Sequence, residues 1–161
     1  MITCQFENGN PAKLRHVTVN GIIIKDGKIL LAKRGSYQGK PILESGKWAL
    51  IGGFMDRDEN LENALKREVK EETGWDVDNL KLFHIKDNPN RPAEDRQNVE
   101  FIFLAEATNN EAVQTEEVSN LQWFAVEELP PIETVAFDHG VDLELYKKYI
   151  QKPFPLPVLG K

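Results

Sequence analysis

The stretch that decides the fold is GFMDRDENLENALKREVKEETGW, residues 53–75. Its central part predicts a helix over 60–73, with Asn60 as the N-cap and Gly74 just beyond the last turn. A rotation of about 100° per residue places three apolar side chains on one face. They are Leu61, Leu65 and Val69. We expect this face to pack on the core.

Carboxylates interrupt the same face. With Leu61 set at zero, Glu68 falls at about 340° and Glu72 at about 20°, while Glu71 lies at about 280°, at the edge of the cluster. Burying unpaired like charges costs several kcal/mol per ion, on the order of the whole stability of a small domain. A divalent cation such as Mg²⁺ or Mn²⁺, which takes hard oxygen ligands, would compensate. The alternative is a solvated helix end whose glutamates balance Lys66, Arg67 and Lys70.

The residues before the helix favour a ligand site. Gly52 and Gly53 end an apolar stretch, and paired glycines allow a tight turn with backbone groups aimed at a ligand or metal. Residues 53–74 hold seven acids and four bases, a charge of −3, which is half of the net −6 of the chain. The acidity is therefore concentrated in this segment.

Residues 53–75 resemble the signature of the Nudix hydrolases, the Nudix box. The positions that match are Gly53, Glu59, Arg67, Glu68, Val69, Glu71, Glu72, Gly74 and Trp75. The flanking stretches WALIGGF (48–54) and LQWFAVEELP (121–130) also resemble the family. The resemblance implies an α/β/α sandwich with a mixed β-sheet between helices, and we expect one such domain over residues 1–161.

The resemblance implies a metal-dependent hydrolase that cleaves the diphosphate of a nucleoside diphosphate joined to another group, with Mg²⁺ as the cofactor and Mn²⁺ as a substitute. By position in the box, Glu68 and Glu72 look like catalytic metal ligands. Glu71 and a backbone carbonyl of Gly53 look like further ligands. Arg67 belongs to the same catalytic set and looks like the partner of Glu59, which we expect to be structural support.

Two glutamates are candidates for the general base. Glu117, in QTEEVSNLQWF (114–124), is the leading candidate, and its alternative is a solvated loop glutamate. Glu100 competes with it. Alternation along a strand places Glu100 with Ile102 and opposite Phe101 and Phe103, so simple exposure on a polar face is an equal alternative.

Two short stretches resemble ADP-ribose pyrophosphatases and indicate the substrate. They are DNPNRPAEDRQNVEFIF (87–103) and AFDH (136–139). Arg91 and Arg96 are candidate contacts to phosphate or ribose, and Phe137 or Trp75 to a base. The alternative for the two arginines is a solvated loop, and the alternative for the two aromatic residues is packing in the core. We expect His139 to be hydrogen-bonded and structural. The favoured function is hydrolysis of ADP-ribose or a nucleotide sugar. One alternative is a nucleoside triphosphate pyrophosphohydrolase, including one that acts on oxidised nucleotides. The other is a sensor that binds a nucleotide sugar without catalysis.

The rest of the chain predicts an α/β domain. Asp26-Gly27 predicts a hairpin between 16–25 and 28–33 with which the domain opens, and 34–47 reads as a loop. Further strands are expected at 48–51, 80–85, 99–105 and 121–125. A second helix is expected at 141–150.

Composition sets the outer limits. The 161 residues suit one domain at the usual ~150 residues per domain. The net charge of −6 argues against a nucleic-acid or membrane partner. The partner that the resemblance implies is a small nucleoside diphosphate derivative. The single cysteine, Cys4, and the lack of a signal or membrane segment favour a cytoplasmic location. A homodimer is left open by the resemblance.

Overall fold

The computed structural model describes residues 2–91, 97–111 and 115–160. Its largest element is an eight-stranded mixed sheet in the order β11-β4-β3-β10-β9-β12, with β7 paired to β4 and β8 paired to β3. The β3–β10 and β9–β12 pairs are parallel and the others antiparallel. The strands of this sheet are β3 (Val17–Lys25), β4 (Lys28–Arg34), β7 (Trp48–Ala49), β8 (Ile51–Phe54), β9 (Trp75–Lys86), β10 (Val99–Asn110), β11 (Val118–Ala125) and β12 (Val158–Leu159).

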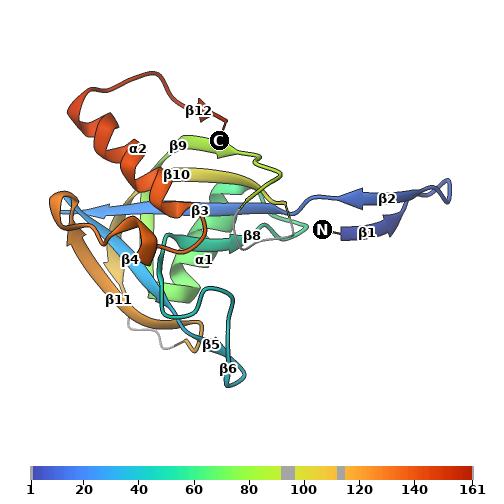
Figure 1. The fold of residues 1–161 in the computed structure, drawn as a ribbon, viewed down its shortest axis with the longest axis horizontal. Coiled ribbons are helices and arrows are strands. Elements are labelled where there is room, and N and C mark those ends of the chain that lie inside the picture. Colours follow the sequence, from blue (N-terminus) through green and yellow to red (C-terminus); the bar gives the residue numbers. More distant parts are fainter. Residues whose placement is uncertain (1, 92–96, 112–114, 161) are drawn as a thin grey trace.

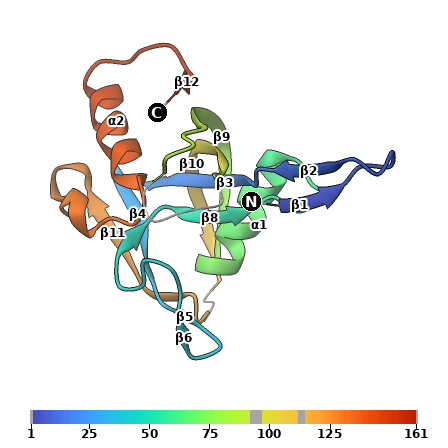
Figure 2. The same cartoon turned by 45° about the vertical axis from the view of Figure 1, so that its right-hand side comes forward.

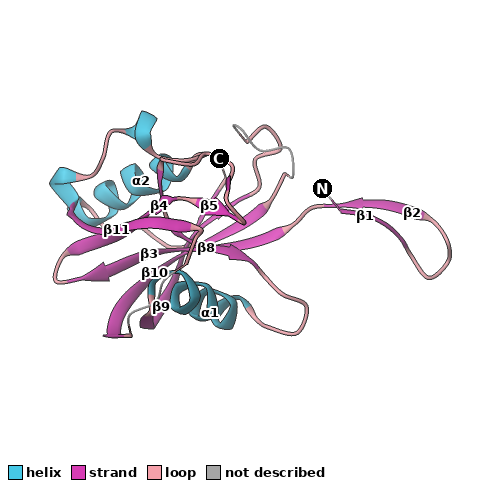
Figure 3. Cartoon of the chain, turned by 90° about the horizontal axis from the view of Figure 1, so that it is seen from below, coloured by secondary structure: helices cyan, strands magenta, loops and turns pink. Residues whose placement is uncertain are grey.

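Two helices cover the two faces of this sheet. Figure 3 shows α1 (Leu61–Thr73) below the strands and α2 (His139–Gln151) above them. Alternation along the strands supplies a core to each side: Val19 and Phe103 pack toward α1, while Ile22 and Ile102 pack toward α2. The expected α/β/α sandwich with a mixed sheet is confirmed.

The central strand β3 shares one of its edges between two partners. Residues 23–25 pair with β4 across the expected hairpin, and residues 18–21 pair with β8. Since β4 and β8 part at this point, the sheet splits beside the middle of β3. The split brings Gly52 and Gly53 of β8 next to α1 and leaves room for a cavity between them and the rest of the sheet.

Both ends of α1 lie where the sequence predicts them. The Asn60 side chain accepts a hydrogen bond of 2.9 Å from the Asn63 amide, and Gly74 adopts the left-handed conformation (φ 75°) and ends the helix. The buried residues Leu65 and Val69 lie on the predicted core face. The predicted helix is therefore confirmed at both boundaries.

Other boundaries differ from expectation. A short hairpin, β1 (Ile2–Gln5) and β2 (Pro11–Leu14), precedes β3 and projects from the body of the molecule (Figures 1 and 2). The hairpin expected over 16–33 is present as β3 and β4, but β1 and β2 precede it in the chain. The expected loop 34–47 contains a two-residue ladder of β5 (Ser36–Tyr37) with β6 (Lys40–Pro41). Strands β9 and β10 each run for 12 residues, because they pair with each other beyond the apolar segments that predicted them.

The remaining elements connect β11 to α2. They are the 3-10 turns η1 (Val126–Glu128) and η2 (Ile132–Thr134). None of the described helices has the length and apolar character that a membrane crossing requires.

Candidate active site

A cavity of about 330 Å³ opens where the sheet splits. Its walls come from β3, β8, α1, the end of β4, the segments that precede β10 and β11, and the chain around the start of α2. One end is acidic and the other end carries a network of buried charged residues.

The acidic end is formed by α1 and β8. Glu68, Glu71 and Glu72 line it together with Gly52 and Gly53. The Gly52 amide donates a 3.2 Å hydrogen bond to Glu72 Oε2, which fixes this carboxylate against the strand. The helix face that the sequence predicts to be both apolar and acidic thus meets the glycine pair.

At both glycines a side chain would come too close to neighbouring atoms. Gly52 has φ 148°, and a Cβ there would lie 2.1 Å from the Val19 carbonyl oxygen. At Gly53 a Cβ would lie 2.6 Å from Glu68 Oε1. The backbone of β8 therefore leaves just enough room for the Glu68 carboxylate.

We predict that Gly53→Ala lowers turnover more than it lowers stability. The new methyl group meets only the flexible end of Glu68, so the fold accommodates it while the carboxylate moves away. We expect kcat to fall by about 10-fold or more, as for a displaced metal ligand or its support, with the melting temperature within a few degrees of wild type. Kinetics and thermal melting of the purified variant test this. A full retention of kcat would show that the position of Glu68 is unimportant.

The electrostatics of this end favour a bound cation. Burial, together with the neighbouring Glu68 charge, raises the pKa of Glu72 to about 8. Burial also raises the pKa of Glu68, although Arg67 opposes the shift. Two carboxylates that are costly to ionise supply the hard oxygen ligands that Mg²⁺ or Mn²⁺ takes. Within residues 2–91, 97–111 and 115–160, however, no group of three acidic, histidine or cysteine side chains is already arranged to hold a metal ion.

Arg67 holds part of this cluster in place. Its guanidinium contacts Glu59 Oε1 at 2.7 Å, Glu68 Oε1 at 2.9 Å and Glu71 Oε2 at 3.2 Å. It also donates to the Phe54 carbonyl, and Glu59 accepts from the Asp56 amide. The expected Arg67–Glu59 pair is present in the structure. Through it, the loop between β8 and α1 is tied to the helix.

The two candidates for the base lie at different places. Glu117 lines the acidic end, where its charge acts on both Glu68 and Glu72. Glu100 is 2% exposed at the other end, so the alternative of simple exposure is wrong for this residue. Burial opposes its ionisation, but Lys86, His139 and Arg91 outweigh that effect and hold its pKa below the usual range. An effective base at neutral pH needs a pKa closer to 7, which disfavours Glu100.

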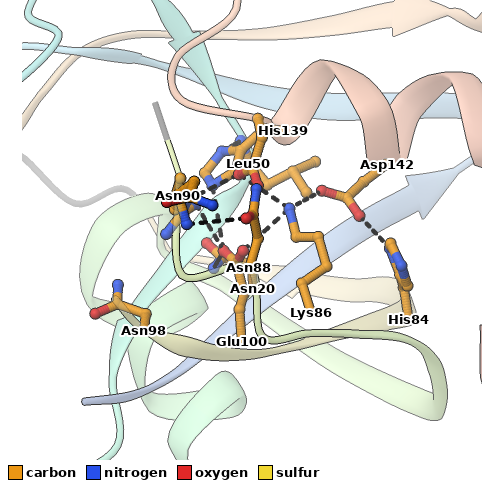
Figure 4. Close-up of polar contacts among 12 residues, drawn as sticks. Asn20, Leu50, His84, Lys86, Asn88, Asn90, Asn98, Glu100, His139 and Asp142 are labelled. Atoms are coloured by element: carbon orange, nitrogen blue, oxygen red, sulfur yellow. Dashed lines mark hydrogen bonds and ion pairs between the residues drawn. The ribbon is translucent and has the colours of Figure 1, made fainter. Parts of the chain in front are cut away.

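The buried network surrounds Glu100, as Figure 4 shows. Lys86 Nζ lies 2.6 Å from Asp142 Oδ2, 3.0 Å from Glu100 Oε2 and 3.1 Å from Asp138 Oδ1. Asp142 also contacts His84 Nδ1 at 2.7 Å. One acid from β10, one from the N-cap of α2 and one from α2 itself thus share one lysine from β9.

His139 and Asn20 join this network to the cavity wall. The Leu50 amide donates to His139 Nδ1 at 3.1 Å, and Asn20 Nδ2 donates to Glu100 Oε1 at 2.5 Å. His139 is accordingly hydrogen-bonded, as expected. Because its Nδ1 accepts this bond, His139 holds the backbone at Leu50, immediately before β8.

The predicted substrate contacts have different outcomes. Arg91 lines the cavity with 7% of its side chain exposed, held by Asp138 at 2.8 Å and Glu100 at 3.1 Å, so a solvated loop is wrong for it. Arg96 lies outside the described residues. Phe137 lines the cavity, and the guanidinium carbons of Arg34 and Arg91 each lie 5.0 Å from its ring centroid. Trp75 does not line it and packs instead at a right angle on Trp123.

Several cavity residues escaped the sequence reasoning. They are Thr18, Asn20, Arg34 and Asn98. Polar residues at 18 and 20 in the otherwise apolar run VTVNGIII were a usable signal, because alternation puts both on one face. Arg34 and Asn98 carry no comparable signal.

Comparison with known proteins places the chain in a family. Residues 14–144 match the model of the NUDIX domain. An ADP-ribose pyrophosphatase of Methanocaldococcus jannaschii is 32% identical over 133 residues, which cover 83% of this chain and 73% of that protein. The NAD-capped RNA hydrolase NudC of Vibrio parahaemolyticus is 34% identical over 109 residues, and the match covers 67% of this chain but only 38% of NudC.

Solved structures agree on the fold. The crystal structure of a NUDIX hydrolase from Nitrosomonas europaea superposes with a TM-score of 0.78 at 24% identity, covering 99% of this chain and 92% of the other. The box residues meet a cavity, and the family model spans most of the chain. This chain therefore belongs to the Nudix family of pyrophosphate-bond hydrolases.

Proposed function

We propose that the protein is a Mg²⁺-dependent pyrophosphohydrolase of ADP-ribose or a similar nucleoside diphosphate sugar, with Mn²⁺ able to replace Mg²⁺. The observation that carries the proposal is the pairing of two opposite environments in one cavity. Carboxylates at one end suit a metal, and Arg34 and Arg91 line the wall beside Phe137. A diphosphate needs both, because its oxygens bind metal ions and guanidinium groups alike.

Each residue has a role in this proposal. Glu68 and Glu72, with Glu71 and the Gly53 carbonyl, hold the metal, which when bound offsets phosphate charge and lowers the pKa of water. Glu117 accepts the proton of the attacking water. Arg67 orients Glu68 and Glu71, and Glu59 holds Arg67. Arg91 binds a phosphate oxygen, and Asp138 and Glu100 orient its guanidinium for that contact.

The relatives support the substrate class. One is named for ADP-ribose and another for NAD-capped RNA, and both names imply a diphosphate attached to a nucleoside. The net charge of −6 favours a small ligand over an RNA chain. A single domain over residues 1–161, a cytoplasmic location and a homodimer stay predictions.

A substrate panel tests the proposal. The purified protein is incubated with Mg²⁺ and ADP-ribose, other nucleotide sugars, NAD, nucleoside triphosphates and oxidised deoxynucleotides, and the products are identified by mass spectrometry. AMP and ribose 5-phosphate from ADP-ribose are the expected products. Nucleoside monophosphate and pyrophosphate from triphosphates alone would assign the site to the triphosphate class. Binding without turnover of any compound would instead assign it to a sensor.

Metal binding should depend on pH through Glu72. Its folded pKa of about 8 lies above the ordinary value of 4.5, so protonation stabilises the metal-free fold, and this contribution is lost as pH rises from about 4.5 through 8. A metal requires the ionised form and therefore binds better as pH rises. We expect Mg²⁺ to raise the melting temperature more at pH 8.5 than at pH 6, and Glu72→Gln to remove most of this difference. An equal Mg²⁺ effect at both pH values would contradict the assignment.

A further inference from the structure

We propose that Thr18 and Asn98 form a subsite at the floor of the cavity that accepts hydrogen bonds from the nucleoside half of the substrate. The group it binds is uncharged and donates hydrogen bonds, as ribose hydroxyls or the exocyclic amine of a base do. This inference rests on the proposed function. It adds to that function two residues that no motif of the sequence marks.

The parallel pairing of β3 and β10 places the two residues on the same face of the sheet. Thr18 stands opposite Glu100 in the register, and Asn98 precedes Glu100 by two residues. Asn20, two residues after Thr18, binds Glu100 from the same face. All four residues line the cavity.

The hydroxyl of Thr18 and the side-chain oxygen of Asn98 have no partner. Thr18 is 5% exposed and Asn98 is 6% exposed, yet among the described residues no donor or acceptor reaches Thr18 Oγ1 or Asn98 Oδ1. In Figure 4, Asn98 stands apart from the network and no dashed line reaches it. Asn20 and His139, by contrast, are hydrogen-bonded within the protein.

Such atoms are uncommon in folded proteins, because a buried polar atom without a partner loses its hydration and gains nothing in return. Both residues line a cavity in which a ligand can bind. A ligand that donates to them would recover the lost hydrogen bonds. Their cost in the free protein is therefore explained by a role in binding.

The chemistry of the floor selects the ligand group. Asn98 Oδ1 accepts only, and the Glu100 carboxylate beside it is kept ionised by Lys86 and Arg91 against the effect of burial. The Thr18 hydroxyl can accept as well. Three acceptors together favour N–H or O–H donors and disfavour a second anionic group. The phosphates would then lie between Arg91 and the metal ligands at the acidic end.

Two matched threonine variants test the inference. Thr18→Val keeps the side-chain shape and removes a hydroxyl that the fold does not use, so we expect KM for the substrate to rise about 3- to 10-fold with a melting temperature unchanged or higher. Thr73→Val is the control. Thr73 is also buried, at 3% exposure, but its hydroxyl donates to the Val69 carbonyl at 2.6 Å. We expect it to lower the melting temperature and leave KM unchanged.

The bound group is identified by substrate analogues. The KM effects of Thr18→Val and of Asn98→Ala are measured on the best substrate, on its 2′-deoxy analogue and on its inosine analogue. Loss of the effect on the deoxy analogue assigns the subsite to the ribose, and loss on the inosine analogue assigns it to the base amine. Effects that persist in full on both analogues would overturn the inference.

The failure of this inference is separable from that of the proposed function. If wild-type protein hydrolyses no nucleoside diphosphate derivative in the panel, the proposed function fails first. If wild type is active but Thr18→Val and Asn98→Ala keep wild-type KM values, only the subsite is refuted. A lower melting temperature for Thr18→Val with unchanged KM would assign the hydroxyl to the fold and would equally refute the subsite.

Discussion

Glu72→Gln should reduce kcat by about 10²- to 10³-fold while leaving the fold intact. The substitution keeps the shape of the side chain and removes the charge that a metal requires. It also removes the repulsion between Glu72 and Glu68, which contributes to the raised pKa of Glu72. We therefore expect the metal-free variant to melt no lower than wild type at pH 8. Steady-state kinetics with Mg²⁺ and thermal melting without it provide the two readouts.

The matched control for this variant is Glu62→Gln. Glu62 lies exposed in the first turn of the same helix and does not line the cavity. It should change neither kcat nor the melting temperature beyond about 1 °C, in line with the small effects of most surface substitutions. A Glu72→Gln protein with near wild-type kcat would remove Glu72 from the metal site.

Lys86→Met should destabilise the protein by about 3–5 kcal/mol. Lys86 is 3% exposed and is the shared cation of Glu100, Asp138 and Asp142. Methionine replaces its length but not its charge, so three acids lose their common partner in a region with little water. Burial disfavours the lysine charge, but the three acids outweigh that effect and raise its pKa. Denaturant titration would measure the free energy of unfolding.

Lys66→Met is the comparison for Lys86→Met. Lys66 pairs with Asp78 at 3.1 Å, with 46% and 63% of the side chains exposed. Water screens this pair, and its loss should cost less than about 1 kcal/mol. Adding Asp142→Asn to Lys86→Met should recover part of the stability, because one of the unpaired charges is then removed. A cost below about 1 kcal/mol for Lys86→Met would show that the network does not depend on this lysine.

The sequence predicts the central layers well, because local signals specify them. Asn60 and Gly74 bound α1 by capping chemistry, and Asp26-Gly27 forms the turn of the β3–β4 hairpin with positive φ at both residues. The hairpin β1–β2 and strand β12 were missed. Both are short, and β12 exists only through its parallel pairing with β9, which no local pattern encodes.

The candidate site also has one part that local sequence patterns predict and one part that they do not. The acidic end lies on one helix and the preceding strand, so periodicity alone brings Glu68 and Glu72 together. The other end depends on contacts between distant segments. Asn20 and Glu100 are 80 residues apart and meet because β3 and β10 pair in parallel, and Lys86 and Asp142 are 56 residues apart. Such partners follow from the topology, which the sequence pattern does not fix.

Hydrolysis of ADP-ribose with Mg²⁺ in ¹⁸O-labelled water tests the central claim most directly. The account predicts AMP and ribose 5-phosphate as the products, with one ¹⁸O atom in the phosphate of one of them, because water attacks a single phosphorus. It also predicts that the labelled product forms at least about 100-fold more slowly with Glu72→Gln. Products without label in either phosphate, or an unchanged rate in the variant, would contradict it.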